Sequence, residues 1–380
     1  MFLTDEHEMF RKALRKMLEK EAYPFYEEWE EERQIPRKFW EKLGENGFLC
    51  PMVGEAYGGL GLDFGYSMIL TEELERVGAG LASGIALHSD IVTPYIEAFG
   101  TEEQKQRWLP KSVSGELISA VAMTEPGAGS DLAGIQTTAK RDGDYYILNG
   151  EKTFITNALG ADYVVVVCKT NPDAKPAYRG ISLIVVEAGT EGFKRGKKLD
   201  KIGLHSADTG ELIFEDARVP VSNLLGEEGK GFYYLMDKLQ QERLIVAIEV
   251  QIEAEEMLRI TTNYVKERKA FGGRIADFQN TQFKLAEMAT EIDIGRTYVN
   301  SLVERHMAGD EIVKEVSMAK WWISDMAKRV AAECLQLHGG YGYMEEYEIA
   351  RRYRDIPVAA IYAGTNEIMK GIIAKQVLKD

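Results

Sequence analysis

A glycine- and hydroxyl-rich turn at residues 122–131, AMTEPGAGSD, contains residue types suited to binding a large polar ligand. Glycine permits positive φ angles and close approach of the backbone to a ligand, and successive backbone N–H groups can bind an anion. A solvated turn with a Ser or Asp helix cap fits the same string about equally well. The residues concerned are Thr124, Gly127, Gly129, Ser130, Asp131 and Gly134.

Three further segments carry residues with possible binding roles. Residues 149–157, NGEKTFITN, are expected to begin with a hairpin-type Asn-Gly turn and to end on a strand. Residues 268–272, RKAFG, are expected to close a helix and are followed by Gln279. Residues 336–343, QLHGGYGY, precede Arg351, Asp355 and the string IYAGTNEI at 361–368. Taken singly, these segments are ordinary sheet core, a solvated helix cap and a helix C-terminus.

A carboxylate with the placement of a catalytic base lies in the predicted helix 231–259. Leu235, Leu239, Val246 and Val250 form a stripe at helical spacing, and Glu242 interrupts that stripe at its centre. Removal of a carboxylate from water disfavours its charged form, so this placement predicts a raised pKa for Glu242. The alternative is that Glu242 pairs with a neighbouring arginine on a solvated face.

The segments that must position these residues change in pattern twice along the chain. Helical periodicity, with acidic residues at helix starts, is present at 4–20 and 37–45. The segment up to about residue 115 is therefore expected to be helical, apart from a glycine-rich loop at 51–65. Short β-branched and aromatic runs follow, with a flexible loop expected at 169–180. Long helices then return, since no proline occurs between Pro220 and Pro357. We therefore expect an α+β chain with an all-α N-terminal domain (1–117), a middle antiparallel β-barrel or sheet domain (118–226) and a C-terminal α-helical bundle (227–380).

Composition excludes several classes of function. The 380 residues are 45% hydrophobic and 28% charged, which is ordinary for a globular protein. A net charge of −15 disfavours binding to nucleic acid or to an anionic membrane surface. No run approaches the roughly 20 apolar residues of a membrane span, and the first residues lack a leader pattern, so we expect a cytoplasmic protein. Three widely spaced cysteines and five histidines predict neither disulfides nor a metal site.

Together, and in this order, the segments closely resemble the acyl-CoA dehydrogenase family of flavoproteins over essentially all 380 residues. The two hallmark stretches are AMTEPGAGSDLAG at 122–134 and QLHGGYGYMEEYEIARRYRD at 336–355. Within the family, the strings QQERL, QLHGGYGYMEEY and IYAGTNEIMK are most similar to those of the long-chain acyl-CoA dehydrogenases.

The resemblance implies FAD as cofactor, held partly by a neighbouring subunit. In the family the RKxFG arginine and the QLHGG segment reach a neighbour's flavin, which implies an obligate oligomer, most simply a homotetramer. The positions matching the contacts within one subunit are Met123, Thr124, Gly129, Ser130, Phe154, Ile155 and Thr156, with Thr365 and Glu367 as closing contacts. The positions matching the contacts to the neighbour are Arg268, Phe271, Gln279, Gln336, Leu337, Gly339 and Gly340.

The resemblance also bears on the base. Many family members carry the catalytic glutamate in a YEGT string, but this chain has Ala363 at that position. The isovaleryl and long-chain branches carry their base in an ERL string on the long helix, which Glu242 begins here. Glu249 is a second candidate that lacks the motif match. Arg243 matches an arginine near the coenzyme A moiety, and the Ala363 amide would bind the thioester oxygen, with Ser130 and Gly364 as further substrate contacts.

The implied activity is α,β-dehydrogenation of a medium- or long-chain acyl-CoA in fatty-acid β-oxidation. The base takes the α proton, the flavin takes the β hydride, and electrons pass to an electron-transfer flavoprotein. Three alternatives remain open at this point: a short branched-chain enzyme of the isovaleryl type, an oxidase that uses oxygen, and a non-catalytic acyl-CoA-binding member.

Overall fold

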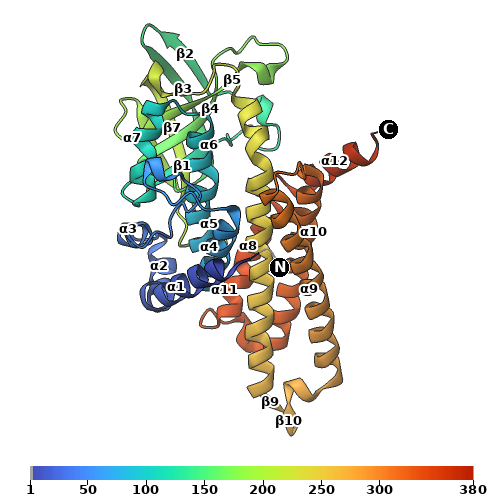
Figure 1. Cartoon of the computed structure of the whole chain (residues 1–380). Helices are drawn as coiled ribbons and strands as arrows, with labels where there is room; N and C mark the ends of the chain where they lie inside the picture. The colour runs from blue at the N-terminus through green and yellow to red at the C-terminus, as the bar shows by residue number, and fades with distance from the viewer. Residues whose placement is uncertain (1–2, 380) are drawn as a thin grey trace.

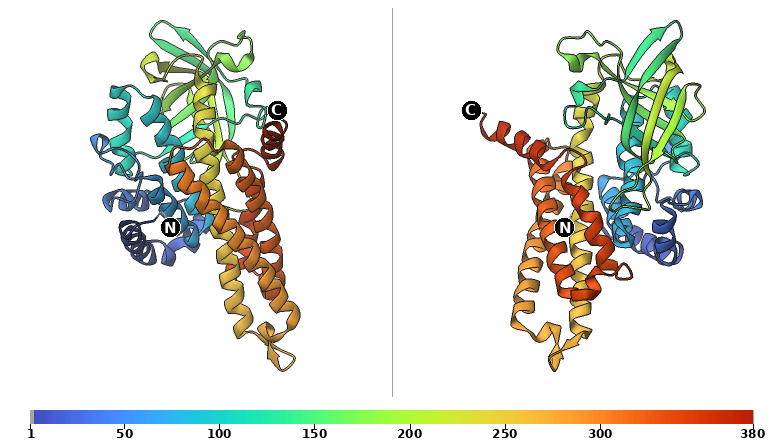
Figure 2. Two further views of the ribbon diagram at one scale, coloured as in Figure 1. Left: turned by 45° about the vertical axis from the view of Figure 1, so that its right-hand side comes forward. Right: turned by 180° about the vertical axis from the view of Figure 1, so that it is seen from behind.

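The computed structural model describes residues 3–379 in three parts (Figure 1). An N-terminal group of helices packs beside the middle of one long helix, and a β-sheet lies above those helices. The C-terminal helices form a bundle around the long helix (Figure 2). This arrangement of helical, sheet and helical parts confirms the fold class expected from the sequence.

The N-terminal part is helical because apolar side chains recur at helical spacing. Leu14, Leu43, Leu70 and Leu74 are fully buried in one core. Thr4 caps the first helix by accepting a hydrogen bond from the backbone N–H of His7. The α-helices here are α1 (Asp5–Glu21), α2 (Tyr26–Glu32), α3 (Arg37–Glu45), α4 (Phe64–Val77), α5 (Ala79–Ala86), α6 (Thr93–Phe99) and α7 (Glu102–Val113), and a π-helical stretch, η3 (Leu87–Val92), joins α5 to α6.

The middle part is one sheet in the order β6-β7-β3-β2-β4-β5-β8, with β1 beside β4. Its strands are β1 (Ser119–Ala122), β2 (Thr138–Asp142), β3 (Tyr145–Thr156), β4 (Tyr163–Lys169), β5 (Ile181–Glu187), β6 (Phe193–Lys198), β7 (Thr209–Pro220) and β8 (Leu224–Leu225). Most strand pairs are antiparallel, as expected, but the sheet is mixed, because β4 pairs in parallel with both β1 and β2.

The predicted turn at Asn149-Gly150 was also wrong. These residues lie within β3, where the register with β7 shifts between Leu148 and Gly150. Gly150 has φ +150°, and an added Cβ would lie 2.4 Å from the Thr137 hydroxyl oxygen, so glycine serves a bulge and a close approach here. The turn that joins β2 to β3 is instead at Gly143, since Asp142 of β2 pairs with Tyr145 of β3.

The C-terminal part is built on α8 (Gly231–Glu267), whose 37 residues make a helix about 55 Å long. It continues beyond the expected end at residue 259. The remaining elements are β9 (Lys269–Ala270), β10 (Gly273–Arg274), α9 (Gln279–Met307), α10 (Val313–His338), α11 (Glu348–Asp355) and α12 (Asn366–Val377). No helix among residues 3–379 is long and apolar enough to cross a membrane.

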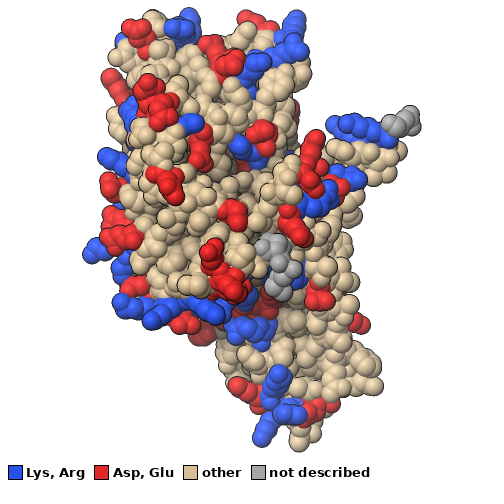
Figure 3. All heavy atoms as spheres, in the orientation of Figure 1, with Lys and Arg blue, Asp and Glu red and all other residues tan. Residues whose placement is uncertain are grey.

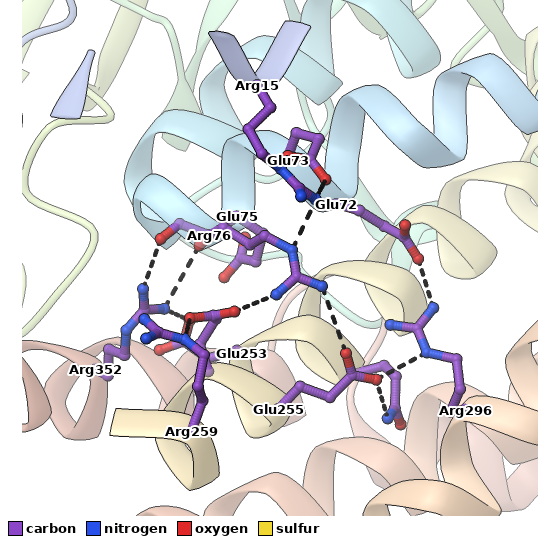
Figure 4. Close-up of polar contacts among 12 residues, drawn as sticks. Arg15, Glu72, Glu73, Glu75, Arg76, Glu253, Glu255, Arg259, Arg296 and Arg352 are labelled. Atoms are coloured by element: carbon purple, nitrogen blue, oxygen red, sulfur yellow. Dashed lines mark hydrogen bonds and ion pairs between the residues drawn. The ribbon is translucent and has the colours of Figure 1, made fainter. Parts of the chain in front are cut away.

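A network of ion pairs joins α4 to the bundle (Figure 4). Arg76 of α4 lies between Glu73 on its own helix and Glu255 and Glu256 on α8. Arg296 of α9 contacts both Glu255, at 2.8 Å, and Glu72 of α4, at 2.5 Å. These buried and half-buried pairs fix the N-terminal helices against α8, which carries the candidate base.

Candidate active site

Glu242 is buried at the contact between α8 and the N-terminal helices. Its side chain is 5% exposed, and the Tyr95 hydroxyl of α6 donates a hydrogen bond of 2.6 Å to Oε1. It makes no ion pair within residues 3–379. The alternative of a solvated glutamate paired with arginine is therefore wrong, although the neighbouring Arg243 contributes a favourable charge.

The electrostatic setting of Glu242 suits a base. Burial raises the pKa of Glu242 to about 7, while the Tyr95 hydrogen bond and the Arg243 charge both lower it. The direction is the one that the apolar stripe predicts. A carboxyl group with this pKa is largely ionised just above neutral pH and remains basic enough to accept a proton from carbon.

A loop at residues 362–365 lies against the same part of α8. The Tyr362 hydroxyl donates to Oε2 of Glu249 at 3.1 Å, and an added Cβ at Gly364 would lie 4.0 Å from an Arg243 guanidinium nitrogen. Ala363 and Gly364 have φ +50° and +90°. This conformation costs Ala363 free energy, and it persists because the surrounding structure holds it. The structure thus brings the predicted substrate residues Arg243, Ala363 and Gly364 beside the candidate base.

Lys320 of α10 holds this loop from behind, a role that we did not predict. Its ammonium group is buried and donates to the Gly364 carbonyl at 2.7 Å and to Oδ1 of Asn366 at 3.3 Å. Burial and the Arg243 charge lower the pKa of Lys320 to about 8. The same signal that identified Glu242 was available, since Lys320 interrupts the buried apolar stripe of Val316, Ile323 and Ala327.

The turn at 122–131 and the end of β3 lie side by side. The Thr153 N–H donates to the Thr124 carbonyl at 3.0 Å. Lys152, fully buried, donates to the Met123 carbonyl at 2.9 Å and forms a 2.8 Å ion pair with Glu125. Glu125 also accepts from the Thr137 N–H at 2.9 Å. This buried pair, absent from our prediction, fixes the two predicted cofactor segments against each other.

The outer side of these segments is open and has free hydrogen-bonding groups. Added Cβ atoms at Gly127 and Gly129 would meet nothing closer than 4.0 Å. Phe154, with φ +59°, is 68% exposed, whereas the neighbouring Ile155 is buried in the sheet. Among residues 3–379 the hydroxyls of Thr124, Ser130 and Thr156 make no hydrogen bond. These features suit a bound polar ligand with a planar ring system.

A second group of predicted cofactor residues lies at the far end of α8 (Figure 1). Arg268 caps α8, and its guanidinium group lies over the Tyr341 ring at 5.1 Å without an ion-pair partner among residues 3–379. Phe271 is 98% exposed. The segment that follows α10 lies beside this end of α8, because the Tyr264 hydroxyl of α8 donates to the His338 carbonyl at 3.1 Å. The exposed predicted residues here are Arg268, Phe271, Gln279, Gln336, Gly339 and Gly340, with Leu337 half-buried.

Within one chain, the cofactor residues at 122–131 and 154–156 lie far from those around Arg268. Arg268 follows Glu242 by 26 residues on a continuous helix, a separation of about 39 Å. Thr365 and Glu367 are in neither group: Thr365 caps α12 by accepting from the Ile368 N–H, and Glu367 is exposed in its first turn.

Comparison with known proteins identifies this architecture. Three family models match in succession: acyl-CoA dehydrogenase N-terminal domain over 4–116, middle domain over 120–217 and C-terminal domain over 229–378. The long-chain specific acyl-CoA dehydrogenase of Sus scrofa mitochondria is 49% identical over 99% of this chain and 87% of that protein. The 3-(aryl)acrylate reductase of Clostridium sporogenes is 39% identical over the full length of both. An acyl-CoA dehydrogenase structure from Geobacillus kaustophilus superposes with a TM-score of 0.98 at 69% identity, covering 100% of this chain and 99% of that one.

Proposed function

The chain belongs to the acyl-CoA dehydrogenase family, a family of FAD-dependent oxidoreductases, and on that basis we propose that it converts a straight medium- or long-chain acyl-CoA to the trans-2-enoyl-CoA with Glu242 as base. The observation that carries this proposal is the burial of Glu242 beside Tyr95, Arg243 and the loop at 362–365.

The proposed cofactor contacts fit FAD. The open turn with the hydroxyls of Thr124 and Ser130, the exposed Phe154 and the Thr156 hydroxyl would hold the flavin of the same chain. The unpaired Arg268 and the exposed Phe271 would contact the FAD of a neighbour. FAD, when bound, accepts the hydride from the β carbon of the acyl group.

Glu242 would take the α proton. Because its carboxyl is buried and held by one hydrogen bond from Tyr95, the orientation of Oε1 is fixed before substrate binds. The Ala363 N–H would donate to the thioester oxygen and stabilise the negative charge that develops there as the proton leaves. Lys320 is a positioning residue in this scheme, since its hydrogen bond to Gly364 restrains the loop that carries this amide.

The chain-length part of the proposal is supported by the small side chain of Ala86. Ala86 packs in the same buried cluster as Val246 and Val250, which continue the face of α8 beyond Glu242. A small side chain at this position would favour an acyl chain that runs along α8. The matched long-chain enzyme agrees with this substrate class, whereas the matched reductase catalyses a reaction on an arylacrylate and leaves the physiological direction to be tested.

The proposal also includes an electron-transfer flavoprotein as electron acceptor, a homotetramer and a cytoplasmic location. An oligomer is supported by large apolar side chains exposed on the C-terminal helices, among them Phe283 and Ile294 of α9 at 58% and 56%. On the face shown in Figure 3, charged side chains of both signs cover the upper part, while a wide area over the C-terminal helices carries few.

Anaerobic spectroscopy of the purified holoenzyme tests the proposal. Straight acyl-CoAs from C4 to C16 should bleach the flavin of the parent and of Glu27→Gln, an exposed control on α2, and should fail to bleach Glu242→Gln. Equal bleaching in Glu242→Gln would remove this residue from the mechanism. Preference for isovaleryl-CoA would overturn the straight-chain assignment, and stoichiometric peroxide in air would establish an oxidase. A holoenzyme that no acyl-CoA bleaches would be a non-catalytic member.

A further inference from the structure

A small cavity beside Tyr362 is lined by four carboxyl groups. They come from different elements: Glu75 from α4, Glu249 and Glu253 from α8, and Asp355 from the end of α11. Figure 4 shows Glu75, Glu253 and Arg352 meeting between α4, α8 and α11. Oε1 of Glu253 and Oδ2 of Asp355 are buried and make no hydrogen bond within residues 3–379. The remaining lining is apolar: Ala79, Leu204, Val250, Ile356, Val358 and Ala359.

The cavity lies where an acyl chain would end. Glu242, Val246 and Glu249 follow one another at spacings of four and three on one face of α8, so Glu249 lies about 10.5 Å beyond the base. Tyr362, which also lines the cavity, directly precedes Ala363. A thioester bound at Ala363 with its α carbon at Glu242 would therefore direct its chain along α8 towards Glu249. This step rests on the proposed function.

Glu249 faces acidic and phenolic groups but no cation of its own. It is 5% exposed, and its one hydrogen bond within residues 3–379 comes from Tyr362. Asp90 of η3 approaches Glu249 from the N-terminal helices and is 1% exposed. The Ser67 and Ser89 hydroxyls lie nearby, but among residues 3–379 neither carboxylate oxygen of Asp90 accepts a hydrogen bond of ordinary geometry.

The nearby cations contact groups other than Glu249. Arg352 donates to Glu253, to Glu348 at 2.7 Å and to the Arg76 carbonyl at 2.9 Å. Lys201 donates to main-chain carbonyls at Leu204 and Ala207, and its charge and that of Arg351 act on Asp355. The far end of the acyl path therefore has an excess of carboxyl groups over cations.

Burial favours the protonated forms of the carboxyl groups around this cavity. Burial raises the pKa of Glu249 to about 8, with a smaller contribution from the charge of Asp90, and the Tyr362 hydrogen bond lowers it. Burial also raises the pKa of Asp90 and of Asp355 to about 7, and that of Glu75 well above its usual value. Glu249 is thus mostly neutral at pH 7 and mostly charged at pH 9.

We propose that Glu249 determines chain-length specificity: an acyl chain long enough to reach it binds only when this carboxyl is protonated, and a short chain binds regardless of its ionisation. The physical reason is that a methyl terminus displaces water from the carboxyl group. A buried carboxylate that keeps only the Tyr362 hydroxyl as donor, with neither water nor a cation beside it, is strongly disfavoured. Long-chain binding above pH 8 is therefore coupled to uptake of one proton from solvent by Glu249.

The ratio of kcat/KM for dodecanoyl-CoA to that for butyryl-CoA tests the proposal in the holoenzyme. Titration of Glu242 affects both substrates and cancels in the ratio. We expect the ratio to fall about tenfold from pH 7 to pH 9, as the protonated fraction of an acid with a pKa of about 8 does. In Glu249→Gln, which keeps the shape without the charge, the ratio should stay constant. A constant ratio in the parent, or an equal fall in both proteins, would overturn the inference.

Asp90→Asn provides a second variant if Glu249→Gln fails to fold. Removing the charge at residue 90 lowers the pKa of Glu249, so the fall of the ratio should move to lower pH; an unmoved fall would contradict the inference. Calorimetry supplies a readout without turnover: trans-2-dodecenoyl-CoA at pH 8.5 should take up most of one proton per site, and trans-2-butenoyl-CoA none. Butyryl-CoA bleaching with a pH-independent ratio would refute only this inference, whereas absent bleaching with both substrates would refute the proposed function.

Discussion

At the scale of single residues, the hydrogen bond from Tyr95 sets how basic Glu242 is. It favours the carboxylate, and therefore holds the pKa below the level that burial alone would give. In Tyr95→Phe we expect the rise of kcat/KM with pH to move upward by about one to two pH units. A hydrogen bond to a charged group contributes about 1.5–3 kcal/mol, and one pKa unit corresponds to about 1.4 kcal/mol. Butyryl-CoA is the appropriate substrate because it does not reach Glu249.

Tyr57→Phe is a matched control for this measurement, since Tyr57 donates to Glu102 on α7 rather than to Glu242. Its pH profile should coincide with that of the parent. A Tyr95→Phe profile that also coincides would mean that this hydrogen bond is equally strong with both forms of Glu242.

At the scale of elements, α10 contributes to the chemistry only through its contact with the loop at 362–365. Replacement of Lys320 by Met leaves the Gly364 carbonyl without its donor, at a cost of about 1–3 kcal/mol. We expect Lys320→Met to lower kcat about tenfold because the Ala363 amide loses its fixed position, while KM changes less. Steady-state kinetics and thermal unfolding would measure both effects.

The variant Leu14→Ala is a control that separates an effect of Lys320 on the position of the loop at 362–365 from an effect on the stability of the fold. Leu14 is fully buried in the N-terminal core, so its truncation destabilises the fold by about 2–5 kcal/mol. It should leave kcat unchanged at temperatures where the protein is folded. If Leu14→Ala lowers kcat as much as Lys320→Met does, Lys320 acts on stability alone.

Sequence reasoning predicted helices and the candidate base well because both depend on local periodicity. Helix α3 begins and ends at the predicted residues, and the stripe around Glu242 is buried as expected. The Asn149-Gly150 turn failed because pairing with β7 overrides the local preference of Asn-Gly for a hairpin. The partners Tyr95, Lys152 and Lys320 were missed, since each contact depends on tertiary packing that joins residues 27 to 147 positions apart.

At the scale of the whole molecule, replacement of Arg268 tests the proposal that neighbouring subunits share each cofactor site. We expect Arg268→Ala to fold normally but to lose FAD affinity about 10- to 100-fold, since a charge-assisted hydrogen bond contributes about 1.5–3 kcal/mol. The ratio of flavin to protein absorbance after gel filtration measures the loss. Lys266→Ala, an exposed change two residues earlier, is the control and should retain FAD.

Retention of FAD by Arg268→Ala at the level of the control would argue that this end of α8 contacts no cofactor. Loss of flavin together with unchanged sedimentation would place the effect in the cofactor site rather than in subunit association.

The length of α8 has a genetic consequence. Because about 39 Å of helix separates Glu242 from Arg268, the two residues of one chain would serve different flavins. Chains carrying Glu242→Gln and chains carrying Arg268→Ala would each form inactive assemblies. Refolded together, they would form hybrids in which some sites combine an intact base from one parent with an intact arginine from the other, so two null alleles of this gene would complement each other.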